Sequence, residues 1–78
     1  MTMWIKTDLG VLYNCDKFDL IAVEEDNVMN TFYVAGFVGG VSKPLSDMGM
    51  SKEDAEQLRD DIYDALESGD TGFDIANA

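Results

Sequence analysis

The hydrophobic and polar positions of this chain change their period near residue 50. Short runs of apolar residues at 3–6 and 11–14 predict a β-hairpin, and 18–24 predicts a third strand. The longest strand signal covers 28–38 and carries large apolar side chains on both faces, so its inward face stays open. A fifth, edge strand is predicted at 41–45, which contains a proline that lacks the amide an inner strand needs.

Residues 51–67 have the period of an amphipathic helix. At about 100° per residue, one sector of this helix is apolar. The sector contains Ala55, Leu58, Ile62, Ala65 and Leu66. Ser51 is the expected N-cap, and Gly69 is the expected residue just beyond the C-terminus.

The opposite side of the same helix carries a row of carboxylates, which we call the acidic stripe. It consists of Glu53, Glu56, Asp60, Asp64 and Glu67, with Asp61 beside it. No basic residue falls in this stripe, and like charges at i,i+4 destabilise a helix by about 0.2–0.5 kcal/mol per pair. The stripe therefore either keeps the protein in solution or faces a positively charged partner, for which these six residues are the predicted contacts.

Strands followed by a single helix predict an α+β fold. We expect an antiparallel β-meander of four to five strands, with the C-terminal amphipathic helix packed on one face. Residues 1–69 would form a single domain, and 70–78 would be a short, loose acidic tail, from which Phe73 and Ile75 are the side chains able to dock.

The charge of the chain narrows the possible partners. Sixteen acidic residues against five basic ones give a net charge of −11. This field repels nucleic acid and anionic membranes, because a protein needs Lys and Arg to bind either of them. It favours binding to the basic surface of another protein. The longest uncharged run, 27–42, is too short and too rich in glycine for a membrane span.

Residue types that commonly carry catalysis are scarce. The chain has no histidine and a single cysteine, so we expect neither a nucleophile–base pair nor a metal centre. We therefore also expect no cofactor and no enzymatic activity. The N-terminus lacks a basic segment followed by an apolar one, so we expect no signal peptide and a cytoplasmic protein.

Two resemblances bear on these expectations. The segments 4–7 (Trp-Ile-Lys-Thr) and 10–14 (Gly-Val-Leu-Tyr-Asn), with the acidic helix start at 52–56, resemble many small uncharacterised bacterial and phage proteins. That group carries no assigned activity. In size, charge and lack of catalytic residues the chain is also similar to acidic phage anti-CRISPR proteins that mimic DNA. This second likeness involves no shared motif, so no functional residue is carried over from it.

Two functions fit these observations. The first is a non-enzymatic inhibitor that mimics nucleic acid and binds the basic surface of a DNA- or RNA-binding complex. The stripe rises by about 5.5 Å per charge, which is coarser than the roughly 3.4 Å between phosphates along one DNA strand. The second is a small interaction or homodimerisation module with an incidental acidic surface. Its contact would be the sheet face opposite the helix, carrying some of Phe32, Tyr33, Val34 and Phe37.

Overall fold

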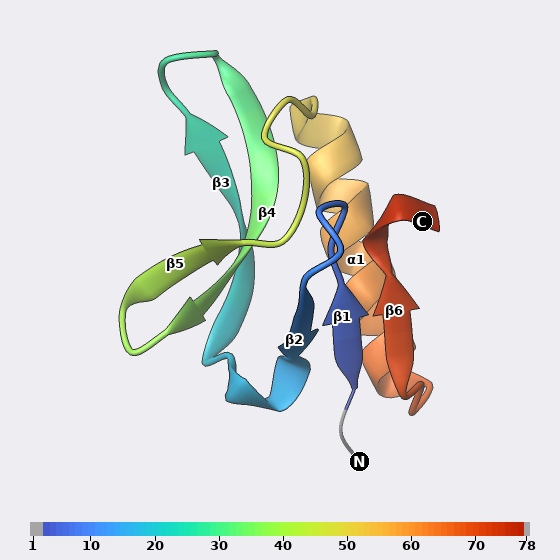
Figure 1. Ribbon diagram of the computed structural model, residues 1–78. Coiled ribbons are helices and arrows are strands. Elements are labelled where there is room, and N and C mark those ends of the chain that lie inside the picture. The colour runs from blue at the N-terminus through green and yellow to red at the C-terminus, as the bar shows by residue number, and fades with distance from the viewer. Residues whose placement is uncertain (1–2, 78) are drawn as a thin grey trace.

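A computed structural model describes residues 3–77, and these residues form an α+β fold, as predicted (Figure 1). They contain six strands in two three-stranded sheets, one α-helix and two short 3-10 helices. The elements are β1 (Trp4–Lys6), β2 (Leu12–Asn14), η1 (Cys15–Lys17), β3 (Leu20–Asp26), β4 (Thr31–Val38), β5 (Val41–Pro44), α1 (Lys52–Glu67), β6 (Gly72–Asp74) and η2 (Ile75–Asn77).

The strands are divided between two sheets, where we expected one meander. β3, β4 and β5 form an antiparallel meander, whereas β1 lies between β2 and β6 in the other sheet. The division follows from η1, which turns the chain out of the first hairpin directly after β2. The side chain of Asn14 accepts a 3.0 Å hydrogen bond from the amide of Asp16 and caps this turn.

The C-terminal segment is ordered, so the prediction of a loose tail at 70–78 was wrong. β6 pairs in parallel with β1, placing Phe73 opposite Ile5, and Ile75 is buried. The second edge of β1 offers backbone groups that need hydrogen-bond partners, and β6 supplies them. Phe73 and Ile75 dock as the sequence allowed, while Ala78 lies outside the described residues.

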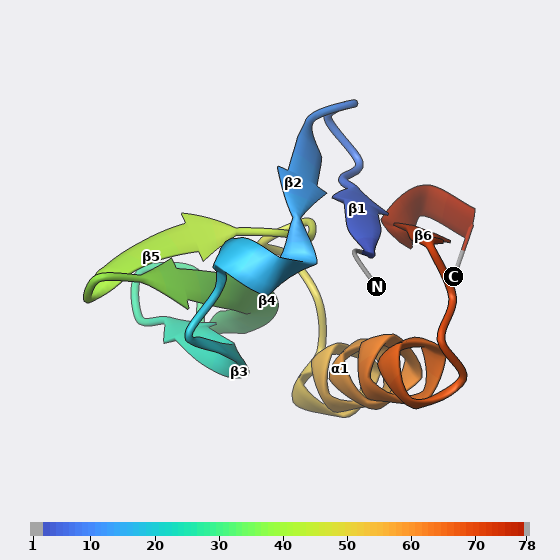
Figure 2. The same ribbon diagram turned by 90° about the horizontal axis from the view of Figure 1, so that it is seen from below.

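The hydrophobic core lies where α1 meets both sheets. Figure 2 shows β1, β2 and β6 above α1 and the β3–β4–β5 sheet to its left. The buried core side chains are Met3, Ile5, Cys15, Val34, Leu45, Ala55, Leu58, Ile62, Ala65 and Ile75. One helix therefore closes a core to which both sheets contribute, and burial of each large side chain contributes about 1.5–3 kcal/mol.

The inward face of β4 carries Phe32 and Val34, which belong to the core or pack against it. Because side chains alternate along a strand, Tyr33 and Phe37 point to the opposite face. Gly36 is buried on the inward face, where the ring of Phe18 lies against it. The face of β4 that the sequence left open is thereby assigned.

Both ends of α1 are capped as predicted. The hydroxyl of Ser51 accepts a 3.1 Å hydrogen bond from the amide of Asp54. At the other end Gly69 has a positive φ of 76°, and the amide of Asp70 donates to the carbonyl of Ala65. Within residues 3–77, no helix has the length and apolar character needed to cross a membrane.

Candidate partner-binding surface

The outer side of α1 carries the acidic stripe that the sequence predicts. Four residues of the helix are buried against the core: Ala55, Leu58, Ile62 and Ala65. On the opposite side Glu53, Asp60, Asp64 and Glu67 are exposed, whereas Glu56 and Asp61 are half-buried. The structure thus brings five of the six predicted residues onto one solvent-facing row and sets Asp61 at its edge.

Three neighbouring side chains on α1 contact the predicted carboxylates. Arg59 forms an ion pair with Asp60, with 3.1 Å between Nη2 and Oδ1, and its Nε also donates to the same oxygen. The amide of Gln57 donates a 2.9 Å hydrogen bond to Asp61. The hydroxyl of Tyr63 donates a 2.7 Å hydrogen bond to Glu67.

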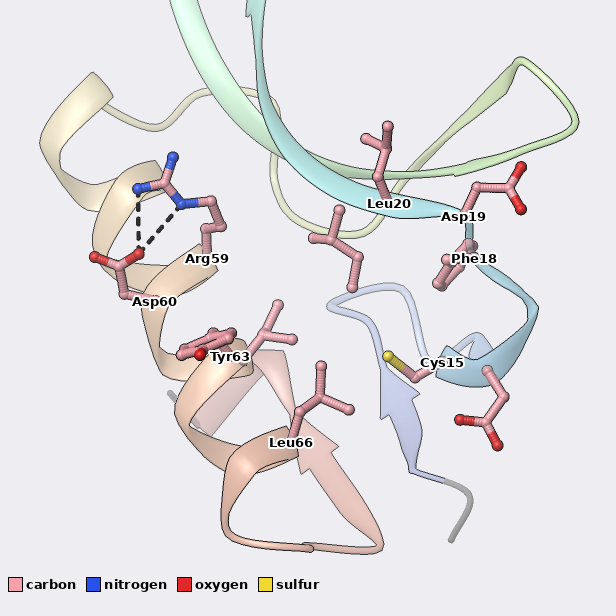
Figure 3. Close-up of a pocket in the computed structure, with 11 residues that line it drawn as sticks. Cys15, Phe18, Asp19, Leu20, Arg59, Asp60, Tyr63 and Leu66 are labelled. Atoms are coloured by element: carbon pink, nitrogen blue, oxygen red, sulfur yellow. Dashed lines mark hydrogen bonds and ion pairs between the residues drawn. The ribbon is translucent and has the colours of Figure 1, made fainter.

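The ion pair with Arg59 reduces the charge of the stripe at one position only. On the helical projection Arg59 lies outside the stripe, but its long side chain reaches the neighbouring carboxylate (Figure 3). Among the described residues, Glu53, Glu56 and Asp64 have no ion-pair partner. An exposed pair of this kind contributes about 1 kcal/mol at most, so the carboxylate of Asp60 can exchange Arg59 for another cation.

The C-terminal end of the stripe lies at an unfavourable place on the helix. The carbonyl end of a helix carries a partial negative charge, which basic residues normally balance. The last turn of α1 contains no basic residue, and Asp64 and Glu67 are part of this turn. These carboxylates therefore reduce the stability of α1 through the helix dipole as well as through their mutual repulsion.

A second group of carboxylates lies along one flank of α1. Asp54 and Asp61 of the helix line a groove of about 540 Å³ together with Asp8 and Asp47. Its lining also includes apolar side chains, namely Met50, Leu58 and Ile75. We call this the acidic groove, and none of the described residues that line it is basic.

Asp8 and Asp47 were missed because only the tertiary fold brings them to the helix. Asp8 accepts a 3.1 Å hydrogen bond from the amide of Asp47, 39 positions further along the chain. No local pattern in the sequence signals a contact of this range. Within residues 3–77, no three His, Cys, Asp or Glu side chains are arranged to hold a metal ion.

The other flank of α1 borders a more apolar groove, which we call the η1–α1 groove (Figure 3). It has a volume of about 560 Å³ and lies between the second half of α1 and the chain from η1 to the start of β3. Its apolar lining includes Cys15, Phe18, Ile21, Ile62, Tyr63 and Leu66. Charged side chains line it as well, among them Asp19, Arg59 and Asp60.

The thiol of Cys15 is one of the groups that line the η1–α1 groove, and it is buried. Burial raises the pKa of this thiol above 9.0, and the negative charge of Asp16 raises it further. The thiol is therefore neutral at neutral pH, whereas a nucleophilic cysteine needs a lowered pKa. Cys15 acts here as a small apolar side chain.

Comparisons with protein-family models, with curated proteins and with solved structures each found no match to this chain.

Proposed function

We propose that this protein is a non-enzymatic inhibitor that mimics nucleic acid and acts in the cytoplasm of a bacterial host cell. In this proposal the acidic stripe and Asp61 bind the basic surface of a DNA- or RNA-binding complex, in the manner of the acidic anti-CRISPR proteins that mimic DNA in phage counter-defence. One observation supports it above all: the carboxylates of α1 face solvent, and Arg59 alone among the described residues forms an ion pair with one of them.

The net charge supports association with a basic partner. A charge of −11 on 78 residues creates a field that attracts a positively charged surface and accelerates encounter. At contact, Lys and Arg side chains would form charge-assisted hydrogen bonds with the carboxylates. Such binding weakens as salt rises, because the screening length falls from about 10 Å at 0.1 M to about 3 Å at 1 M.

The acidic groove widens the charged surface beyond a single row. Along the stripe the carboxylates rise by about 5.5 Å each, which is coarser than phosphates along one DNA strand. Asp8 and Asp47 add carboxylates from outside the helix, next to Asp54 and Asp61. A basic surface that contacts two backbones of a duplex would therefore meet carboxylates both on the outer side and on one flank of α1.

The test is competition with nucleic acid. The immobilised protein is incubated with a bacterial lysate at about 0.1 M salt, and bound proteins are eluted with excess duplex DNA. We expect the specific partner to be released by the DNA. A partner that stays bound in the presence of excess DNA would contradict mimicry.

Two substitutions with the same effect on net charge locate the contact. Asp64→Lys lies in the stripe, whereas Glu24→Lys lies on β3, on the sheet face that points away from the core. Each changes the net charge by two units. We expect Asp64→Lys to weaken capture about tenfold or more and Glu24→Lys to leave it nearly unchanged. Equal effects would indicate attraction by net charge alone.

A homodimerisation module is the second candidate function. The outward face of the β3–β4–β5 sheet carries Leu20, Tyr33 and Phe37, of which Leu20 is 52% exposed. Uncovered apolar area on a sheet is typical of a contact surface. In this case light scattering at moderate salt would measure the mass of a dimer, and Glu24→Lys rather than Asp64→Lys would dissociate that dimer.

A further inference from the structure

The η1–α1 groove leaves apolar side chains in contact with solvent. Tyr63 is 58% exposed and Leu66 is 42% exposed, although both lie on α1 next to its buried face. In Figure 3 the side chains of Leu66 and Cys15 point into the space between α1 and η1. An apolar groove with polar groups at its rim is typical of a site that receives an apolar group from a partner.

Charges around the groove select the kind of partner. Asp19 lies on one side, and Asp60 lies on the other beside Arg59. The stripe residues Asp64 and Glu67 continue the negative charge along the same part of α1. A second copy of this chain would bring its own carboxylates to the rim, and an anionic lipid would be repelled in the same way. A basic polypeptide is attracted.

We propose that the η1–α1 groove binds one large apolar side chain from a basic segment of the partner, while Lys and Arg on either side of that side chain contact the acidic stripe. This inference rests on the proposed function and identifies the partner's contact segment as amphipathic and basic. The groove is large enough for such a side chain, since its volume is about 560 Å³.

The two parts of the contact respond differently to salt. Ionic contacts with the stripe are screened as salt rises, whereas burial of an apolar side chain is not weakened by screening. Filling the groove therefore gives the complex a component that survives high salt. It also favours a partner segment that carries an apolar residue among its Lys and Arg residues over one that carries only Lys and Arg. An apolar groove that is left unfilled contributes nothing to binding.

Two synthetic peptides test the groove. One is an amphipathic peptide of Leu and Arg at helical spacing, and the other has the same Arg residues with Ser in place of every Leu. We expect the Leu peptide to shift the amide NMR signals of Phe18, Ile21 and Leu66, and to stay bound at about 1 M salt. The Ser peptide should shift only signals of the stripe and dissociate at that salt concentration.

Substitution of Leu66 provides the matched test on the protein. Because Leu66 is 42% exposed, Leu66→Gln should keep the fold, which circular dichroism checks. We expect this substitution to weaken binding of the Leu peptide about tenfold or more and to leave binding of the Ser peptide unchanged. Val28→Gln, at a position that is 93% exposed and far along the chain from the groove, is the control and should affect neither peptide.

The outcomes separate the two proposals. If both peptides bind equally and shift only stripe signals, the groove proposal is wrong and the proposed function stands. If neither peptide binds at low salt, both proposals are wrong. Leu-peptide shifts confined to Tyr33 and Phe37 would show that the outward sheet face is the apolar contact, and they too would overturn the groove proposal.

Discussion

The hydroxyl of Tyr63 donates a 2.7 Å hydrogen bond to Oε1 of Glu67, one turn later on α1. Tyr63 lines the η1–α1 groove and Glu67 belongs to the acidic stripe, so the bond links the apolar and the charged parts of the surface. It also holds the phenol ring beside the groove. Both residues are exposed, so a partner that binds this part of α1 would contact the bond directly.

The first prediction concerns the titration of Tyr63. The hydrogen bond to Glu67 raises the pKa of Tyr63 above 10.0, with smaller contributions from burial and from the charge of Asp64. A raised pKa in the folded state means that folding favours the protonated phenol. This contribution to stability is complete below the ordinary pKa and is lost as pH rises through the raised value.

The measurement is a pH titration of the Tyr63 ring-carbon NMR signal. We expect Glu67→Gln to lower the pKa of Tyr63, because the neutral amide no longer favours the phenol over the phenolate. Tyr63→Phe should remove this part of the alkaline loss of stability. An unchanged Tyr63 pKa in Glu67→Gln would show that the hydrogen bond is not maintained in solution.

The second prediction is that Asp64→Lys stabilises the fold while it weakens partner binding. The change removes a like-charge pair with Asp60 and places a cation near the carbonyl end of α1. We expect a gain of about 0.5–1.5 kcal/mol in the free energy of unfolding, measured by urea denaturation at low salt. Glu24→Lys is the control for net charge, and a stripe that merely aids solubility would show the gain in stability without any loss of binding.

Features set by neighbouring residues could be predicted from the sequence. The helix, its caps and its acidic stripe depend on residues three or four positions apart, and all of them are found in α1. The hairpin of β1 and β2 likewise follows from a short loop between apolar runs. β4 begins at Thr31, three residues later than expected, because residues 27–30 form the turn.

Features that depend on distant contacts could not be predicted. β6 is three residues long and becomes a strand only because β1 lies beside it, almost seventy positions earlier in the chain. The acidic groove depends in the same way on contact between Asp8 and the loop that contains Asp47. For each of these features the local residues are compatible with a loop, and the contact with a distant segment determines which structure forms.

The third prediction tests the importance of the C-terminal segment. Ile75 is 6% exposed in the core, so Ile75→Ala should lower the free energy of unfolding by about 2–5 kcal/mol. That is a large part of the stability of a domain this small. Val28→Ala removes the branches of a side chain that is 93% exposed and should change stability by less than about 0.5 kcal/mol. Equal, small effects on the urea midpoint would mean that the tail does not pack in solution.

The fourth prediction concerns the close approach of Gly36 and Phe18 beneath the η1–α1 groove. A Cβ at Gly36 would lie 2.7 Å from Cδ1 and Cε1 of the Phe18 ring, so Gly36→Ala must displace the ring. We expect the free energy of unfolding to fall by about 1–3 kcal/mol, measured by thermal unfolding.

Two further variants separate this clash from the general effect of replacing a glycine in a strand. Gly72→Ala adds a methyl group that meets only the carbonyl of Trp4, at 4.0 Å, and should leave stability within about 0.5 kcal/mol of the parent. Phe18→Leu in the Gly36→Ala background should recover part of the loss, because a smaller side chain gives the new methyl room. Since Phe18 lines the groove, the same Gly36→Ala variant should also bind the Leu peptide more weakly, whereas its binding of the Ser peptide should not change.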